Sequence, residues 1–360
     1  MNAITYYSYD NIRVENRSIP AITDRELLVK VHGCGLCGSD IIKIVQKAAP
    51  PVILGHELTG TIVERGAAVS NFAVGQRVVV AHHVPCGICH YCRHANYSMC
   101  AAFKSSNIDP CGFSEYIRVP AQHVLHTTLP LPDSLTAEEG SFIEPLACCV
   151  RAVYRTPLLP GDSVVVMGLG SIGLLMLQAV KAIGGWSEDR ANMANGANGE
   201  NSVRVYGVDM LPERLALARA LGADEAFLAP SDEQGLRRIL APLTENRGAD
   251  AAIITAAGAR PFQQALAAVR KGGSINIFAA HAGATPINLE ALYQQELTIS
   301  STYSSSPEEL RIALDLLTSR KVRVANLISH RLPLAQFAEG VALMQQRAAL
   351  KVYFQIAGEQ

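Results

Sequence analysis

The segment GDSVVVMGLGSIGLLMLQAVKAIG, residues 161–184, carries the clearest fold signal in the chain. A short apolar run that favours a strand leads into glycines at the spacing GxGxxG, and an apolar run of helical length follows them. In this order the glycines let the backbone approach a pyrophosphate that is bound at the N-terminus of the helix. We therefore predict a dinucleotide-binding turn made by Gly168, Gly170, Ser171, Ile172 and Gly173.

Strand and helix patterns continue to alternate after this turn. A strand pattern, VRVYGVDM, is followed by a helix pattern, PERLALARALGA; DAAIITAAG, PFQQALAAVRKGG and SINIFAAH then read as strand, helix and strand. Such alternation is typical of a doubly wound parallel sheet in the α/β class.

Asp209 lies at the end of the strand that follows the glycine turn. A carboxylate at this place holds the ribose hydroxyls of NAD and repels the 2′-phosphate of NADP. We assign Arg214, on the next helix, to the same cofactor site. The sequence therefore favours NAD as the cofactor.

The spacing between the glycines and Asp209 is unusual. Asp209 follows Gly173 by 36 residues, whereas about 20 are usual. The excess is SEDRANMANGANGENS, residues 187–202, which is rich in Asn, Gly and Ala and has few side chains able to pack. We interpret it as a surface insertion on the side away from the nicotinamide.

The N-terminal part contains a mixed set of metal-ligand candidates. Cys37 is followed, within the stretch that ends in Gly55-His56-Glu57, by an imidazole and a carboxylate. Zinc accepts such a set while one position stays open for water or substrate. The alternative is that Cys37 is a small buried residue and His56 a hydrogen-bonded core histidine.

A second group of cysteines lies in VPCGICHYCRHANYSMC. Four thiols within one short loop match a closed tetrahedral zinc site, and an iron–sulfur cluster is the minor alternative. The four are Cys86, Cys89, Cys92 and Cys100.

Short alternating runs in residues 1–80, and again in FSEYIRVP, predict a β-rich domain of mostly antiparallel strands. A helix is expected from about Thr136, and it carries Glu144 in apolar surroundings. Such a carboxylate binds a metal or pairs with a base such as Arg151. The C-terminal KVYFQIAG has the pattern of an edge strand, so we expect the chain to return there to the first domain.

Composition limits the classes of function. The chain has 360 residues, 49% of them hydrophobic, and a formal net charge of −1, with no basic block. Nucleic acid and anionic membrane are therefore not expected as partners. No signal peptide or membrane-spanning run is recognised, so a cytoplasmic protein is expected, and its nine cysteines favour metal binding or burial over disulfides.

With these residues in view, the chain resembles the zinc-containing medium-chain dehydrogenase/reductase family. The Glu144-Pro145 pair is similar to the branch of sorbitol (L-iditol) and threonine dehydrogenases. The resemblance implies a discontinuous GroES-like catalytic domain and a Rossmann cofactor domain. The expected ranges are 1–150 for the catalytic domain, 151–290 for the cofactor domain, and 291–360 for the return to the catalytic domain.

The resemblance also implies roles for the candidate residues. Cys37 and His56 would bind a catalytic zinc, with Glu57 and Glu144 completing the site directly or through water, and the four-cysteine loop would bind a structural zinc. Zinc would act as a Lewis acid on an alcohol oxygen while hydride passes to NAD. Ser39 matches the hydroxyl that takes the substrate proton. Many relatives continue that proton path with a histidine, for which this chain has Ile42, so water, the cofactor ribose or Lys43 would have to serve.

The substrate class is inferred from polar segments that line the pocket in relatives, here residues 103–107 and 301–304. Hydroxyl-rich linings suit a polyol or sugar-like secondary alcohol. The alternatives are L-threonine or another amino alcohol, and a weakly catalytic reductase or cofactor-binding scaffold. A homodimer or homotetramer is expected.

Overall fold

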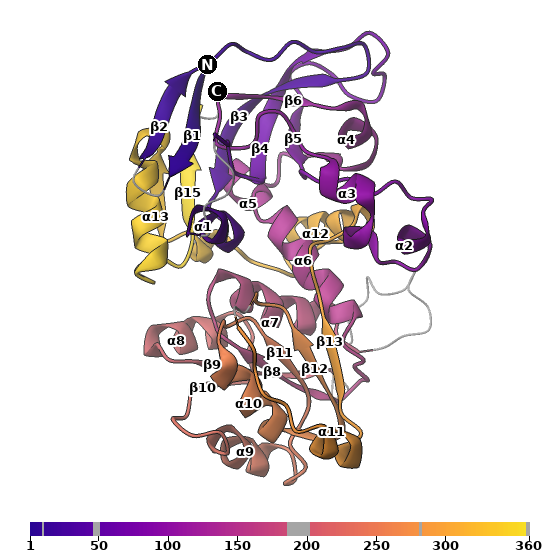
Figure 1. The fold of residues 1–360 in the computed structure, drawn as a ribbon, viewed down its shortest axis with the longest axis vertical. Coiled ribbons are helices and arrows are strands. Elements are labelled where there is room, and N and C mark those ends of the chain that lie inside the picture. Colours follow the sequence, from indigo (N-terminus) through magenta and orange to yellow (C-terminus); the bar gives the residue numbers. More distant parts are fainter. Residues whose placement is uncertain (9–10, 46–50, 186–201, 281–282, 358–360) are drawn as a thin grey trace. The chain divides into compact units, whose positions relative to one another are not determined.

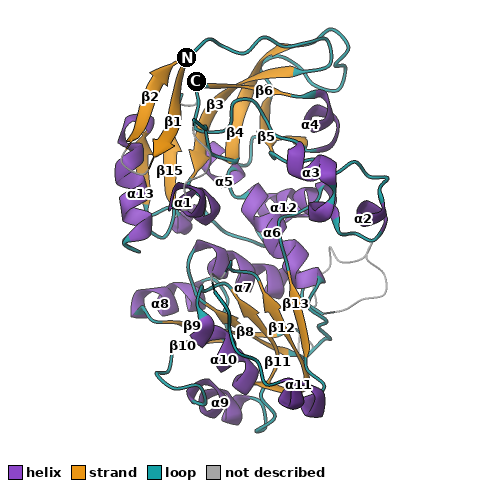
Figure 2. Cartoon of the chain, in the orientation of Figure 1, coloured by secondary structure: helices purple, strands orange, loops and turns teal. Residues whose placement is uncertain are grey.

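The computed structural model describes residues 1–8, 11–45, 51–185, 202–280 and 283–357. Within that part the chain forms two compact units (Figures 1 and 2). Unit 1 contains Met1–Ala147, Ser305–Arg320 and Val324–Gln360, and unit 2 contains Cys148–Ser304 and Lys321–Arg323. The predicted insertion at 187–202 lies, apart from Ser202, outside the described residues. None of the described helices combines the length and apolar character needed to span a membrane.

Unit 2 is built on a six-stranded sheet in the order β10-β9-β8-β11-β12-β13, in which all neighbours are parallel. The strand order reverses direction between β8 and β11, which is the switch point at which doubly wound folds bind nucleotides. The predicted Rossmann sheet is therefore confirmed. Its strands are β8 (Ser163–Met167), β9 (Arg204–Asp209), β10 (Glu225–Leu228), β11 (Ala249–Ile254), β12 (Val269–Ile277) and β13 (Thr298–Ser301). Its helices are α7 (Ser171–Ile183), α8 (Pro212–Ala220), α9 (Gly235–Leu240), α10 (Ala259–Ala268) and α11 (Leu289–Gln295).

The burial of the central strands of this sheet explains why their apolar sequence pattern predicted strands. Every residue of β8 and of β11 is buried, because each strand has a neighbour on both sides and is covered on both faces. Such strands need continuous apolar runs, which VVVM and AAII supply. The following helix α7 is also mostly buried, from Gly173 to Val180.

The boundaries of unit 2 differ from the expected ones. The first segment of unit 1 ends at Ala147, inside helix α6 (Ile143–Tyr154), close to the expected residue 150. The chain returns to unit 1 at Ser305 instead of residue 291, because β13 extends the parallel sheet by pairing with β12. Residues 269–273, expected in a helix, begin β12, and the short β10 and α9 were not predicted.

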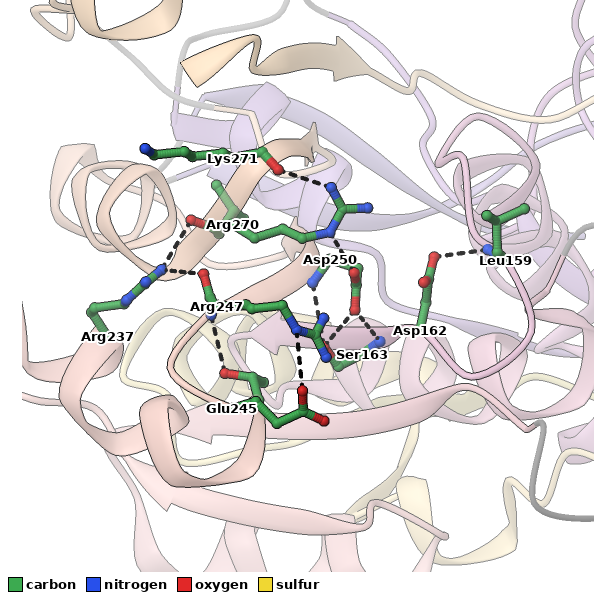
Figure 3. A network of polar contacts seen from close by, with 12 residues as sticks. Leu159, Asp162, Ser163, Arg237, Glu245, Arg247, Asp250, Arg270 and Lys271 are labelled. Carbon is green, nitrogen blue, oxygen red and sulfur yellow. Dashed lines mark hydrogen bonds and ion pairs between the residues drawn. The ribbon is translucent and has the colours of Figure 1, made fainter. Parts of the chain in front are cut away.

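A polar network fastens the amino-terminal ends of three strands in unit 2 (Figure 3). Asp250, on β11, accepts hydrogen bonds through Oδ2 from the backbone N–H and the hydroxyl of Ser163 on β8, both at 2.8 Å. Its Oδ1 accepts from Nε of Arg270 on β12, at 2.5 Å. Burial raises the pKa of Asp250, but the bonds from Arg270 and Ser163 outweigh it and hold that pKa below its usual value.

We expect Asp250→Asn to lower the melting temperature of the protein by several degrees, because about 1–3 kcal/mol is lost when buried donors lose a charged acceptor. The folded-state pKa of Asp250 lies below its unfolded value, so its contribution is present above about pH 4 and is lost as the pH falls through the folded-state pKa. Calorimetric melting at several pH values should therefore show a difference between variant and wild type that shrinks in acid. Asp232→Asn, which removes an exposed pair with Arg238, is the control and should change little. Equal melting temperatures for the Asp250 variant and wild type at neutral pH would contradict the assignment.

Unit 1 contains a seven-stranded sheet and a separate two-stranded one. The larger sheet has the order β14-β15-β3-β4-β5-β7, with β6 paired to β3, and all pairs except β14-β15 are antiparallel. This arrangement confirms the β-rich GroES-like domain. The strands are β1 (Asn2–Ser8), β2 (Asn11–Asn16), β3 (Leu27–Gly35), β4 (Glu57–Arg65), β5 (Arg77–Val80), β6 (Tyr116–Val119), β7 (Thr128–Pro130), β14 (His330–Pro333) and β15 (Val352–Gln355). The helices of four or more residues are α1 (Gly38–Val45), α2 (His90–Arg93), α3 (Ala101–Ser105), α4 (Ala121–His126), α5 (Ala137–Gly140), α12 (Pro307–Thr318) and α13 (Phe337–Gln345), together with the start of α6.

The sequence pattern of β15 suggested an edge strand, but the structure places β15 inside the sheet. It lies between β14 and β3, pairing parallel with the first and antiparallel with the second. Three aromatic rings explain its inward place, because Phe354 on β15 contacts Phe113 and Phe337 at centroid distances of 5.5 and 4.9 Å. These rings belong to the apolar core of unit 1, which therefore joins segments from both ends of the chain.

The helix expected from Thr136 is two helices. Thr136 caps α5 with a reciprocal pair of bonds: its hydroxyl accepts from the Glu139 N–H at 3.1 Å, and Glu139 accepts from the Thr136 N–H at 2.9 Å. The chain then restarts as α6, and Glu144 lies in the first turn of this second helix.

Candidate metal centres and nucleotide-binding turn

The strand pair β3–β4 brings the first set of ligand candidates together. Glu57 opens β4 opposite Gly35 of β3, and Cys37 follows that strand by two residues. As a result the donor atoms of Cys37, His56 and Glu57 all lie within 4.8 Å of one another. A thiol, an imidazole and a carboxylate at this separation fit the ligand set of a zinc ion.

Gly55 sets the direction from which His56 enters the cluster. Its φ is +97°, and a Cβ there would lie 2.8 Å from the backbone nitrogen of Phe113. An L-residue would therefore meet both backbone strain and a clash. His56 itself is buried, and its Nε2 lies 3.5 Å from the hydroxyl oxygen of Ser39.

Asp40 is a site residue that was not recognised in the sequence. It is completely buried, and its Oδ1 lies 3.4 Å from Nδ1 of His56. Its Oδ2 accepts from the backbone N–H of Cys37 at 3.3 Å, so one carboxylate orients both ligands, as second-shell groups of metal sites do. Burial would raise the pKa of Asp40, but His56 holds that pKa below its usual value. The available signal was an acid three residues after Cys37.

Electrostatics in this cluster favour a cation. Burial alone would lower the pKa of His56, yet the carboxylate of Asp40 and the thiolate of Cys37 raise that pKa well above its usual value. Negative surroundings that hold a proton on an imidazole also favour a metal ion in its place.

We expect Asp40→Asn to weaken zinc binding about 10- to 100-fold, because the amide keeps the shape but loses the charge that orients His56. Competition with a chromophoric chelator measures the zinc dissociation constant directly. Asp133→Asn, at an exposed position, is the matched control and should bind zinc like the wild type. Unchanged affinity in the Asp40 variant would remove Asp40 from the site.

Glu57 is paired with a second unrecognised residue, Lys351. The side chain of Lys351 is 4% exposed and that of Glu57 is 0% exposed. Lys351 Nζ forms an ion pair with Glu57 Oε2. Among the described residues, the Glu57 oxygens have no further hydrogen-bond donor. Burial lowers the pKa of Lys351, but Glu57 and Cys37 raise it above its usual value. An oxygen pair with spare acceptor capacity fits a site that takes a cation.

Glu144 lies near the cluster without joining it. Its carboxylate is not among the donors that lie within 4.8 Å of one another. Burial, aided by the charge of Glu57 and opposed by His56, raises the pKa of Glu144 to about 7. Of the two acids expected to complete the ligand set, the structure therefore brings Glu57 to the thiol and imidazole and leaves Glu144 beside them.

Ser39 lies at the exposed side of the cluster. Its hydroxyl donates to Cys37 Sγ at 3.3 Å, and the residue is exposed. Ile42, where many relatives carry a histidine, is 39% exposed, and Lys43 is exposed beside it.

The four-cysteine loop is assembled around α2. The thiols of Cys86, Cys89, Cys92 and Cys100 lie within 4.8 Å of one another and form no disulfide. Sγ–Sγ distances of 3.9 Å and 3.5 Å join Cys92 to Cys86 and to Cys89. Four sulfurs about 2.3 Å from a tetrahedral zinc would lie about 3.8 Å apart. The loop thus has the donors and the spacing of a closed zinc site.

Several polar groups in the segments expected to give a polar lining are hydrogen-bonded within the protein. Ser105 donates to the Ala101 carbonyl at 3.1 Å, Ser106 accepts from the Val84 N–H at 2.8 Å, and Asn107 donates to Cys111 Sγ at 3.1 Å. The other segment, residues 301–304, belongs to unit 2, where the Thr302 hydroxyl accepts from Asn276 at 3.1 Å. The hydroxyls of Ser106 and Thr302 are therefore already engaged within the protein, whereas Tyr303 in the second segment is 64% exposed.

The glycine turn in unit 2 has the shape that a pyrophosphate needs. A Cβ on Gly173 would lie 1.8 Å from the Gly168 carbonyl oxygen, so only glycine allows α7 to approach β8 so closely. A Cβ on Gly170 would meet nothing within 4 Å, which leaves open space at the first N–H groups of α7, from Ser171 and Ile172.

Asp209 closes this turn from the neighbouring strand. Its Oδ2 accepts from the Leu169 N–H at 2.6 Å, and its Oδ1 accepts from the Leu211 N–H at 3.0 Å. Arg214 Nη1 lies 3.6 Å from Asp209 Oδ2. The structure thus brings the glycine turn, the acid and the arginine to one end of the sheet.

Comparison with known proteins gives consistent matches. Residues 23–133 match the alcohol dehydrogenase GroES-like domain, and residues 192–319 match the zinc-binding dehydrogenase family. The chain is 31% identical to D-arabitol-phosphate dehydrogenase of Enterococcus avium, over 96% of this chain and 94% of that one. It is 30% identical to sorbitol dehydrogenase of Bacillus subtilis, over 98% and 96%. A solved zinc-binding dehydrogenase structure from Sinorhizobium meliloti 1021, which holds NADP, superposes with a TM-score of 0.84 at 27% identity, covering 98% of each chain.

Proposed function

Since this chain belongs to the zinc-binding alcohol dehydrogenase family and is therefore a dehydrogenase, we propose that it oxidises a secondary alcohol of a polyol or sugar-like substrate. The proposal includes one catalytic and one structural zinc per chain, and NAD as the hydride acceptor. The observation that carries it is the cluster of the half-buried Cys37 with the buried His56 and Glu57, in which Asp40 contacts both Cys37 and His56. The curated relatives that act on arabitol phosphate and sorbitol support the substrate class.

The residues in and around the cluster have different roles in the proposed reaction. When bound, zinc supplies Lewis acidity toward the alcohol oxygen and the nicotinamide supplies a hydride acceptor. Cys37, His56 and Glu57 hold the metal, and the four-cysteine loop holds the other ion without an open position. Asp40 fixes the ring of His56, and Lys351 balances the charge of Glu57.

Ser39 takes the proton of the substrate hydroxyl in this proposal. Its oxygen lies beside two ligand candidates, 3.3 Å from Cys37 Sγ and 3.5 Å from His56 Nε2. Because Ser39 is exposed, it hands the proton to water, and Ile42 need not take part.

A substrate screen tests the proposal. Zinc-loaded protein is offered polyols, polyol phosphates and amino alcohols including L-threonine, each with NAD and NADP in parallel, and reduced nicotinamide is measured. Turnover of polyols with NAD is expected. If amino alcohols were oxidised in preference to polyols, the substrate class would be amino alcohols instead. If no combination of alcohol and cofactor gave turnover, a cofactor-binding scaffold would be favoured.

The preference for NAD rests on Asp209, whose carboxylate would face the ribose and repel a 2′-phosphate. Arg214 lies within 3.6 Å and is paired with that acid. We expect Asp209→Ala to shift the ratio of kcat/KM for NAD over NADP toward NADP by at least about tenfold, roughly 1.4 kcal/mol, because repulsion is removed and Arg214 is released. A general disturbance of the glycine turn would affect both cofactors equally, so it would not change the ratio of kcat/KM for NAD over NADP. Glu213→Ala, an exposed neighbour, is the control, and an unmoved ratio in the Asp209 variant would mean that another group reads the ribose.

We also propose that the protein works in the cytoplasm as a homodimer or homotetramer. Strand β13 is an edge of the parallel sheet, and the helix before it exposes Leu289 and Tyr293 by 73% and 83%. An open edge beside exposed apolar side chains is suited to pairing with another copy. Light scattering of the purified protein measures the state, and a monomer at micromolar concentration would contradict it.

A further inference from the structure

His82 lies immediately beside the catalytic cluster, on the chain that leaves strand β5. Its ring contacts the ring of His56 at a centroid distance of 4.5 Å and the ring of His83 at 3.9 Å, with interplanar angles of 37° and 40°. The side chain is thus a direct neighbour of a metal-ligand candidate, although nothing in the mechanism above uses it.

The position of His82 is fixed by groups other than its own ring nitrogens. Its backbone carbonyl accepts from Nε2 of His123 at 2.9 Å. The adjacent His83 is held in turn, since its Nδ1 lies 2.7 Å from the Ser106 carbonyl and its ring contacts Phe103 at 4.8 Å. The imidazole of His82 therefore has a defined place that does not depend on hydrogen bonds from its own Nδ1 atom.

The Nδ1 atom of His82 is buried and has no hydrogen-bond partner among the described residues. A buried polar atom left in this state costs about 1–3 kcal/mol, and native proteins rarely keep one without a use. The Nδ1 of His123 is in the same condition, but no ring contact joins that residue to His56. His82 therefore differs from His123 in its ring contact with His56, and this contact indicates that a bound substrate is the missing partner of the His82 Nδ1 atom.

Three of the polar groups first assigned to substrate recognition already have partners within the protein, because Ser105 bonds to the Ala101 carbonyl, Ser106 to the Val84 N–H and Asn107 to the Cys111 thiol. A polyol brings hydroxyls besides the one that is oxidised, and each must find a partner when it leaves water. A neutral imidazole offers one donor and one acceptor, and a hydroxyl can serve as either, so both tautomers of His82 can bind it.

Resting on the proposed polyol oxidation, we propose that His82 is a specificity-determining residue that hydrogen-bonds the substrate hydroxyl adjacent to the carbon that is oxidised. The enzyme would thereby select vicinal diols over monohydric alcohols of the same size. The role is one of binding: His82 contacts the neighbouring hydroxyl and leaves the reacting one to the metal cluster.

The test compares two substrates that differ by that one hydroxyl, 2,3-butanediol and 2-butanol. His82→Phe keeps an aromatic ring against His56 and His83 but removes both nitrogens, and His82→Asn restores a polar group near the place of Nδ1. We expect the ratio of kcat/KM for the diol over the monohydric alcohol to fall about tenfold or more in His82→Phe, mainly through KM, and to recover to within about threefold in His82→Asn. His330→Phe, on β14, is the matched control and should leave the ratio unchanged.

Two kinetic outcomes would overturn the inference. An unchanged ratio in His82→Phe would show that the ring does not read the second hydroxyl. An equal loss with both substrates, without recovery in His82→Asn, would show that His82 only supports His56. Circular dichroism and zinc content of each variant establish that folding and metal binding are intact.

A binding measurement separates this inference from the proposed function. In carbon–proton correlation spectra of the histidine-labelled, zinc-loaded protein, the His82 signal, identified by its absence in His82→Phe, should shift with 2,3-butanediol and not with 2-butanol. If the wild type binds the diol in this way but oxidises neither alcohol, the proposed function fails and the His82 assignment stands. If 2,3-butanediol binds the wild type and His82→Phe with equal dissociation constants, the His82 assignment is overturned. This conclusion holds whether or not the protein oxidises the diol.

Discussion

Replacing Cys37 with serine is expected to remove one zinc per chain and to lower alcohol oxidation by about a thousandfold or more, because Lewis-acid catalysis supplies several kcal/mol of transition-state stabilisation. Cys37 offers the thiol of the Cys37–His56–Glu57 cluster. A serine hydroxyl is a poor substitute for a thiolate ligand. The four-cysteine loop is a separate cluster, so its ion should remain. Plasma mass spectrometry should therefore count two zincs per chain in the wild type and one in the variant.

Cys148→Ser is the matched control, because Cys148 belongs to unit 2 and to neither metal cluster. It should keep both zincs and near-normal turnover. Two zincs in the Cys37 variant, or unchanged turnover with one, would contradict the assignment of the catalytic site. Loss of both ions together would mean that the two clusters do not fold independently.

Lys351→Met is expected to destabilise unit 1 by about 3–5 kcal/mol, because it leaves the carboxylate of Glu57 buried without its counter-charge. The side chains of the pair are 4% and 0% exposed, so water cannot replace the lysine. Calorimetry of the metal-free protein should show the lower melting temperature. Lys104→Met, at an exposed position in α3, is the control and should melt like the wild type.

The double variant Glu57→Gln, Lys351→Met tests the cause of that loss. Removing both charges should restore much of the stability, since the cost arises from one unpaired charge rather than from lost packing. A double variant as unstable as Lys351→Met alone would mean that the lysine stem matters through its packing. Equal stability of Lys351→Met and the wild type would mean that Glu57 finds another partner.

Local patterns in the sequence were sufficient for most of unit 2. The glycine turn, β8, α7 and Asp209 could be predicted because strand, turn and helix follow one another within a few dozen residues, and each has its own periodicity. The short β10 and α9 were missed, since an element of four to six residues has too few positions to show a period. The cysteine loop was also predictable, because its four thiols are close in sequence as well as in space.

The residues that were missed at the catalytic cluster depend on contacts between distant segments. Lys351 meets Glu57 only because β15 enters the sheet beside β3, and the pattern of β15 suggested an edge strand instead. Asp40 was near Cys37 in sequence, but its burial against His56 follows from the packing of α1. The sequence also could not show which hydroxyls of the expected polar lining are already bonded, as those of Ser105, Ser106 and Thr302 are.

Zinc content and polyol oxidation measured on the same metal-stripped and stepwise reloaded samples test the central claim most directly. If the Cys37–His56–Glu57 cluster is the catalytic zinc site, NAD reduction by a polyol should be absent in the stripped protein and should rise in proportion to zinc bound beyond the four-cysteine site, reaching its maximum at two ions per chain. Full activity in a chain that holds one zinc, with that ion in the four-cysteine loop, or no activity at two, would contradict it.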